Sequence, residues 1–284
     1  MAIDRVINVL VFITLFQLMV TIGLGVTIQQ VTAVATNWRM VGSAALANYV
    51  LVPAFATALL ALFQSPPLVA AGLLITAVCP GAPYGPPFAG LAGGNVPAAV
   101  GLMALLAGSS AIFSPLLLTI ALPLVAGNEP LTINAVKMDE TLFLTQFIPL
   151  AVGVAIRALR PNWAESLIRP SRRVSLVLNV ATVGLIVAVQ FQLLLAINPT
   201  AVTGMFVLIL ASVGFGWRLG GRSEGDRIAM AFSTGARNFG VSLVIATTSF
   251  PRTQAVDVAL TYGLFQTLVL ALLAAAWGRL RGAS

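Results

Sequence analysis

One arginine lies inside an apolar stretch that looks like a membrane span. Arg237 belongs to the run 233–238, ten residues into a hydrophobic segment at 227–250. A charge at that depth costs at least about 2.5–3.5 kcal/mol, so it is expected to face a cavity, a partner or the interior of a bundle. Its guanidinium can pair with backbone carbonyls or hold an anionic ligand. The alternative interpretation is an arginine that reaches the membrane surface from a misplaced helix end.

A second landmark is the stretch 79–87, which reads Cys-Pro-Gly-Ala-Pro-Tyr-Gly-Pro-Pro inside another apolar segment. Its four prolines cannot continue a helix, because proline lacks the N–H donor and its ring clashes with the preceding turn. Such a break persists in a membrane only where protein or water surrounds the freed backbone groups. Secondary transporters bind substrates at breaks of this kind. Pro83 and Tyr84 are therefore candidate substrate contacts, together with Arg237 and Asn238 of the second break.

Polar side chains on other segments could line the same region. Asn48, five residues before Pro53, is either a substrate contact or one side of an interhelical hydrogen bond, worth about 0.6 kcal/mol. Gln266 and Thr267 on the last segment pose the same choice, and we favour cavity lining for them. Cys79 is interpreted as a small buried hydrophobe, with a thiol ligand as the alternative.

Three carboxylates, Asp139, Glu140 and Asp257, lie near the outer ends of their expected helices. We interpret them as solvated helix ends, with proton relays as the alternative. The run 169–173, which contains three arginines, is interpreted as an inner-face topology determinant that could also contact anionic lipid.

The composition is that of a polytopic membrane protein. Of the 284 residues, 59% are hydrophobic and 8% charged, against roughly 25% charged in soluble domains, and the mean hydropathy is +1.00. Without histidine, most metal-site and general-base chemistry is removed, so neither an enzyme nor a metal cofactor is expected. The net charge of +7 does not indicate nucleic acid, because the arginines fall in short loops. The single cysteine excludes an intramolecular disulfide.

Nine segments approach the roughly 20 apolar residues that a bilayer crossing requires. They lie at 5–27, 38–63, 67–93, 95–126, 137–160, 174–196, 200–219, 227–250 and 254–278. The third and eighth contain the two breaks, Pro115 is the expected bend of the long fourth segment, and the largest loop is expected near 161–173. The first segment is expected to be a retained helix rather than a signal peptide. Residues 1–284 therefore predict one all-α membrane domain.

The basic residues predict the orientation of the chain. Eleven of them lie in the odd-numbered connections and the C-terminal end, whereas only Arg5, Lys137 and Arg252 lie on the opposite side. Basic residues concentrate in cytoplasmic loops. We therefore expect a multi-pass protein of the cell membrane, with its N-terminus outside and its C-terminus in the cytoplasm.

The order of segments also repeats. Residues 1–126 and 174–278 each hold four segments whose third member is broken, and the segment 137–160 links the two groups. Five crossings separate corresponding members, so the two groups have opposite orientations. This pattern predicts an inverted repeat with both breaks near mid-membrane.

Several motifs, in this order, resemble the bile acid:sodium symporter superfamily. They are Gly-Leu-Gly-Val-Thr at 23–27, Ala47-Asn48 with Pro53, Cys-Pro-Gly at 79–81, Gly-Asn-Val at 94–96, Ser-Pro-Leu-Leu at 114–117, and Gly235 with Asn238. Family members usually have ten helices, and this chain looks as though it begins at the second. The resemblance implies a core bundle that carries both breaks, a smaller panel bundle beside it, substrate binding in the crevice between them, and alternating access. It also implies that Asn238 and Thr267 line the cavity, and that Asn48 matches a sodium-site glutamine.

The sodium sites that the resemblance implies lack most of their ligands in this sequence. Where the family has Glu-x-Gly-x-Gln-Asn, residues 233–238 read Ser-Thr-Gly-Ala-Arg-Asn, so Ser233 and Thr234 remain of a degenerate ion site without its carboxylate. Gly85 and Pro86 replace oxygen-bearing side chains of the first break, and Ala99 and Met103 replace hydroxyls on the next helix. A hard cation needs oxygen ligands and a compensating negative charge.

These substitutions predict a transporter without sodium coupling. Arg237 would stand where the ion stood in relatives, and would either hold the break together or bind an anionic substrate. The leading interpretation is a secondary transporter of an organic anion, either a bile-acid-like molecule or a small carboxylate. The sequence indicates no particular oligomeric state. The alternatives are an arsenite-type efflux permease that uses Cys79 and a non-transporting membrane receptor or scaffold.

Overall fold

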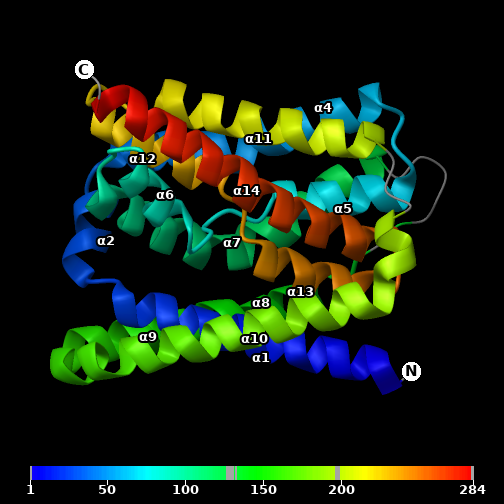
Figure 1. Cartoon of the computed structure of the whole chain (residues 1–284), viewed down its shortest axis with the longest axis horizontal. Coiled ribbons are helices and arrows are strands. Elements are labelled where there is room, and N and C mark those ends of the chain that lie inside the picture. Colours follow the sequence, from blue (N-terminus) through cyan, green and yellow to red (C-terminus); the bar gives the residue numbers. More distant parts are fainter. Residues whose placement is uncertain (1, 126–130, 132, 196–198, 283–284) are drawn as a thin grey trace.

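The computed structural model describes residues 2–125, 131, 133–195 and 199–282, and every regular element in this part of the chain is a helix. The long helices run side by side along the longest axis of the molecule (Figure 1). The helix that begins the chain and the helix that ends it reach opposite ends of this axis (Figure 1). The predicted all-α class is therefore confirmed.

The first half of the described chain contains eight helical elements. They are α1 (Ala2–Gly25), α2 (Ile28–Ala35), α3 (Trp38–Ala45), η1 (Leu46–Leu51), α4 (Val52–Leu62), α5 (Pro67–Ala77), α6 (Gly85–Leu91) and α7 (Val96–Val125). The second half contains α8 (Ala135–Leu142), η2 (Phe143–Phe147), α9 (Ile148–Leu159), α10 (Pro161–Leu195), α11 (Pro199–Leu219), α12 (Glu224–Gly235), α13 (Phe239–Ser249) and α14 (Gln254–Gly282).

Eight spans in the described residues are long and apolar enough to cross a membrane: α1, α3–α4, α7, α8–α9, α10, α11, α12–α13 and α14. The remaining expected segment, 67–93, consists of two short helices, α5 and α6, with residues 78–84 between them. Neither is long enough to cross alone, because a helix rises only about 1.5 Å per residue. The count of nine crossings and the inverted repeat remain predictions.

Two spans contain a single π-helical turn, η1 and η2, just before a proline. Val52 donates its N–H to the carbonyl of Ala47 and Ile148 donates to Phe143, so both bonds reach back five residues. Each wide turn precedes a proline at the next position, whose ring would otherwise clash with the preceding turn. Single π-helical turns of this kind occur frequently at functional sites. The first of them, η1, carries Asn48.

The expected loop at 161–173 is wrong, because α10 is helical from Pro161 to Leu195. Pro161 suits the first position of a helix, where no backbone N–H donor is needed. The charged first turns are held to the end of α9 by an ion pair between Arg157 and Glu165 at 3.4 Å. The arginines at 169–173 therefore lie on a helix and not on a loop.

The helices form two groups. Helices α1, α8–α9 and α10 pack against one another on one side, and α4–α7 and α11–α14 lie mostly on the other (Figure 1). The span α12–α13 is the most enclosed of the eight. In its apolar stretch of 18 residues 89% of the residues are buried, whereas in that of α10 only 17% are buried. The second break therefore lies in the protein interior, and α10 lies at the periphery.

Candidate functional site

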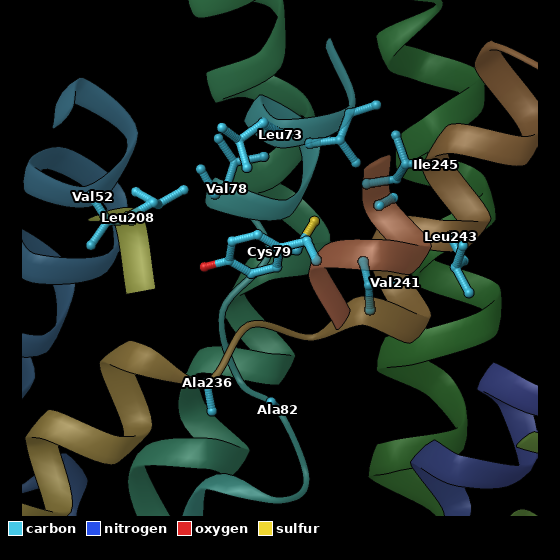
Figure 2. Packing of buried hydrophobic residues seen from close by; sticks show 14 of the residues in the cluster. Val52, Leu73, Val78, Cys79, Ala82, Leu208, Ala236, Val241, Leu243 and Ile245 are labelled. Carbon is cyan, nitrogen blue, oxygen red and sulfur yellow. The ribbon is translucent and has the colours of Figure 1, made fainter. Parts of the chain in front are cut away.

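The two breaks are in direct contact. Residues 78–84 separate α5 from α6, and residues 236–238 separate α12 from α13. The N–H of Asn238 donates to the carbonyl of Cys79 at 2.7 Å, and its side-chain Nδ2 donates to the carbonyl of Gly81 at 3.3 Å. Figure 2 shows the non-helical segment after Ala236 passing beside the first break near Cys79. Each break thus satisfies backbone groups that the other leaves free, as burial requires.

The side chain of Arg237 is 0% exposed and points at the first break. Its Nη1 donates to the carbonyl of Ala77, the last residue of α5, at 3.2 Å. The C-terminal end of a helix carries partial negative charge, so the guanidinium is favourably placed there. Its Nε and Nη2 have no hydrogen-bond partner. We call the place where the two breaks, residues 78–84 and 236–238, meet the crossing. The charge is therefore held inside the crossing, and Arg237 faces neither lipid nor bulk water.

The backbone of Arg237 is fixed by Gln266 of α14 and Tyr84 of the first break. Gln266 Oε1 accepts the Arg237 N–H at 2.9 Å, and Gln266 Nε2 donates to the Arg237 carbonyl at 2.8 Å. The Tyr84 hydroxyl donates to the same carbonyl at 2.6 Å and lies 2.7 Å from Gln266 Nε2. One amide side chain therefore joins both breaks to the last helix.

Local geometry explains why the breaks sit where they do. Asn238 caps α13, because its Oδ1 accepts the N–H of Val241 at 3.3 Å. Gly81 has φ +84°, a conformation that L residues with side chains rarely adopt. A Cβ atom at Gly81 would also overlap the backbone of Ala107 on α7. Ser114 of α7 donates to the carbonyl of Val78 at 2.7 Å and holds the first break from the other side.

Four of the residues predicted for the degenerate ion site, Asn48, Gly85, Ser233 and Thr234, form a second buried cluster beside the crossing. Asn48 is 0% exposed, and its Nδ2 donates to the carbonyl of Ala44 at 2.9 Å and to Thr234 Oγ1 at 3.3 Å. Asn48 Oδ1 and Ser233 Oγ are buried without a partner. A Cβ atom at Gly85 would lie 3.6 Å from the Cα atom of Ser233. The structure thus brings η1, α6 and α12 together here.

A cavity of about 520 Å³ opens between the two helix groups, and we call it the α6–α10 cavity. One wall comes from the first break, α6 and α7, and includes Pro83, Pro86 and Met103. The other wall comes from α1 and α10. The volume lies within the roughly 300–1,000 Å³ that is usual for small-molecule sites.

A smaller cavity of about 300 Å³ lies between the start of α8 and the end of α13, and we call it the α8–α13 cavity. Its lining includes Lys137, Thr141 and Thr248. The α6–α10 cavity touches the beginning of α7, whereas the α8–α13 cavity touches the helix that follows α7. The two cavities therefore lie toward opposite ends of the spans.

The predicted substrate contacts fall into two sets. Arg237, Asn238 and Tyr84 meet at the crossing, and Pro83 lies in the wall of the α6–α10 cavity. Thr267 lies apart from both: it is exposed, and its hydroxyl donates to the carbonyl of Gly263 on its own helix at 2.8 Å.

Residues predicted for the ion site are also divided. Pro86 and Met103 line the α6–α10 cavity. Ala99 is fully buried and is absent from the lining of the described cavities. The neighbour of Thr267 on α14, Gln266, is the residue that reaches the crossing.

Two features escaped the sequence analysis. The first is the polar wall of the α6–α10 cavity, formed by Thr21, Arg172, Ser175 and Asn179. The spacing of Ser171, Ser175 and Asn179, four residues apart, is the signal that could have revealed it. The misplaced loop at 161–173 concealed this spacing.

The second feature is Asp257, expected to be a solvated helix end but 0% exposed, with both carboxylate oxygens unpartnered. The reason is that α14 packs against α5 and α13, so its first turn lies inside the bundle. Asp139 and Glu140 on α8 are exposed as expected.

Comparison with known proteins identifies the family. A human protein named P3 protein is 31% identical over 133 residues, which is 47% of this chain, and the chain spans only 28% of that relative's length. The model of the sodium bile acid symporter family matches residues 12–214, which include η1, the first break, and all of the α6–α10 cavity. The match ends before α12, so the second break with its arginine lies outside it. Because well over half of its residues match, this chain belongs to the sodium bile acid symporter family.

Proposed function

We propose that this chain is a secondary transporter that carries an organic anion by alternating access without sodium coupling. The single observation that carries the proposal is the fully buried guanidinium of Arg237, held at the crossing by the carbonyl of Ala77. It puts a permanent positive charge at the crossing of the two breaks. Coupling to sodium would require a second cation to approach this charge through a protein interior, where like charges repel strongly.

The side chains near the crossing support the same proposal. Sodium is a hard cation that prefers several oxygen ligands, including a carboxylate. The polar side chains around the guanidinium come from η1 (Asn48), α12 (Ser233 and Thr234) and the two breaks (Tyr84 and Asn238). Each is uncharged, so this cluster offers no negative charge to balance a metal ion. The guanidinium itself replaces the bound cation.

Alternating access is supported by the two cavities. The α6–α10 and α8–α13 cavities lie toward opposite ends of the boundary between the helix groups. Rocking of α1, α8–α9 and α10 against the other helices would close one cavity as the other opens. With the C-terminus in the cytoplasm, as the loop charges predict, the larger cavity opens inward.

The predicted orientation has a further support. Trp38 and Trp163 are exposed, and the guanidiniums of Arg39 and Arg160 lie over their rings. Tryptophan gathers at membrane interfaces and arginine on the cytoplasmic side. These pairs suit the inner surface of a cell membrane.

Uptake into proteoliposomes tests the proposal. Labelled cholate, pyruvate and pantothenate are offered separately, with an inward gradient of sodium chloride or of choline chloride. We expect at least one anion to enter at the same rate in both salts. Clear stimulation by sodium would refute the absence of coupling. Binding without uptake in either salt would instead favour the receptor interpretation.

Substitution of Arg237 by methionine separates its charge from its packing. We expect Arg237→Met to abolish uptake, because the end of α5 loses its partner and the crossing loses its charge. The control is Arg39→Met, since Arg39 is exposed and contacts Trp38 far from the crossing. Unchanged uptake by Arg237→Met would reduce Arg237 to a packing role.

A further inference from the structure

The two walls of the α6–α10 cavity differ in chemistry. The wall from the first break, α6 and α7 is built from proline, glycine, valine and methionine side chains, and none of them carries a polar group. All four polar side chains of the lining, Thr21, Arg172, Ser175 and Asn179, belong to α1 and α10. A solute in this cavity therefore meets a polar surface on one side and an apolar surface on the other.

The hydroxyl groups of the polar wall are already held in place. Thr21 Oγ1 lies 2.6 Å from Ser171 Oγ and 2.8 Å from Ser175 Oγ, and Gln17 Nε2 donates to Ser171 Oγ at 2.9 Å. Asn179 Nδ2 donates to the carbonyl of Ser175 at 2.9 Å. The contacts of Gln17 and Thr21 with the two serines join α1 to α10, and the Asn179 bond lies within α10; together they fix the orientation of the wall. They make it a pre-formed surface, which lowers the entropic cost of binding.

Arg172 differs from these neighbours. Within the described part of the chain, no hydrogen bond or ion pair engages its guanidinium, and the carboxylate of Glu165, on the same helix, pairs with Arg157. The adjacent Arg173 is also exposed, but it does not line the cavity. Arg172 is thus the one cation in the lining of the α6–α10 cavity, and it is available to a ligand.

We propose that Arg172 is the residue that selects an amphipathic anion in the α6–α10 cavity, and this rests on the proposed transport function. The carboxylate or sulfonate of the solute lies against the Arg172 guanidinium, its hydroxyl groups face α1 and α10, and its apolar face lies against Pro86, Val100 and Met103. Arginine suits this task, because its planar fork of donors matches a carboxylate. The charge of Arg237 stays inside the crossing and does not contact the solute.

Equilibrium binding tests this assignment. Full-length protein in phosphatidylcholine nanodiscs is titrated with cholate and with its uncharged amide, and the dissociation constants are compared. We expect the wild type to prefer cholate over the amide by about tenfold, the scale of a charge-assisted pair partly exposed to solvent. Arg172→Gln should lose most of this preference, and Arg173→Gln should keep it. Potassium chloride should weaken the preference of the wild type and of Arg173→Gln, because it screens the exposed charge of Arg172 that both retain.

The outcomes separate this inference from the proposed function. If anions enter proteoliposomes but Arg172→Gln keeps the full preference for cholate, the inference is wrong and the transport function stands. Failure of the wild type to bind cholate also overturns the inference, whereas the lack of uptake of any anion overturns the transport function. A difference between Arg172→Gln and wild type that appears only with phosphatidylglycerol present would assign Arg172 to a lipid headgroup instead.

Discussion

Replacing Gln266 by leucine should loosen the crossing without emptying the space that the side chain fills. Leucine is similar in size but has no polar atoms. The change removes both bonds to the backbone of Arg237, at 2.9 and 2.8 Å, and the contact with the Tyr84 hydroxyl at 2.7 Å. The carbonyl of Arg237 keeps the Tyr84 hydroxyl as a donor, but its N–H loses its partner in the interior.

The magnitude follows from these bonds. A hydrogen bond contributes about 0.5–1.5 kcal/mol net, and a buried donor left without a partner costs about 1–3 kcal/mol. Part of that loss is shared, so the expected destabilisation is about 2–4 kcal/mol. For a chain of this length, each kcal/mol lowers the midpoint of thermal unfolding by about 2 °C. Gln266→Leu should therefore unfold about 4–8 °C below the wild type.

Two measurements on purified protein check this prediction: thermal unfolding followed by tryptophan fluorescence, and anion uptake after reconstitution. Uptake should fall with stability, because the amide holds both breaks at once. The matched control is Thr267→Val on the same helix. Thr267 is exposed, and its hydroxyl donates to the carbonyl of Gly263 on its own helix. The unfolding midpoint and the anion uptake of Thr267→Val should therefore stay near those of the wild type.

Equal behaviour of the two variants would refute the reasoning. If Gln266→Leu unfolds at the same temperature as Thr267→Val and takes up anions normally, the crossing is not held by the Gln266 amide. A lower midpoint with normal uptake would confine Gln266 to stability and would separate the crossing from transport.

Three further predictions concern the cavity, the helix cap and the first break. Val100→Trp should reduce uptake by filling the α6–α10 cavity, whereas Leu116→Trp on the exposed face of the same helix should not, and both are compared in the uptake assay. Asn238→Ala should lower the unfolding midpoint by about 2–4 °C and impair uptake, because α13 loses a cap worth about 1 kcal/mol and the first break loses a bond. Gly81→Ala should cost at least about 2 kcal/mol and yield little folded protein by size-exclusion chromatography, since φ is +84° and α7 lies against the glycine. Gly42→Ala, with open space around it in α3, should be neutral or slightly stabilising in the same measurement.

The breaks could be predicted from the sequence because their chemistry is local. Both interruptions overlap the expected runs but are shorter than expected. The first covers residues 78–84, because Pro86 and Pro87 fit the first turn of α6, and the second covers only 236–238, because residues 233–235 still belong to α12. The burial of Arg237 could also be expected, since a charge at that depth must find partners within protein. Its actual partner, the carbonyl of Ala77, could not, because it depends on how two distant breaks pack.

The polar wall escaped prediction for a different reason. Two prolines and four charges between 161 and 173 favour a loop, but residues beyond a membrane surface can be polar and still helical. Because the predicted segment begins at 174, Ser171 and Arg172 lie outside it. The choice between Gln266 and Thr267 posed a similar difficulty, because adjacent residues on a helix point about 100° apart. Only the rotation of α14 against its neighbours decides which of them faces the crossing.

In the proposed alternating-access mechanism, a tethered charge at the crossing would change what can drive movement between the helix groups. A sodium ion enters and leaves, so its binding can favour one conformation over another in each cycle. The guanidinium of Arg237 is present in every conformation, and a constant interaction cannot shift an equilibrium between them. The bias must then come from a group that binds and departs, and the α6–α10 cavity offers such a place, with Arg172 in its lining. If the crossing acts as one rigid unit, the solute itself sets the direction of transport through its own gradient.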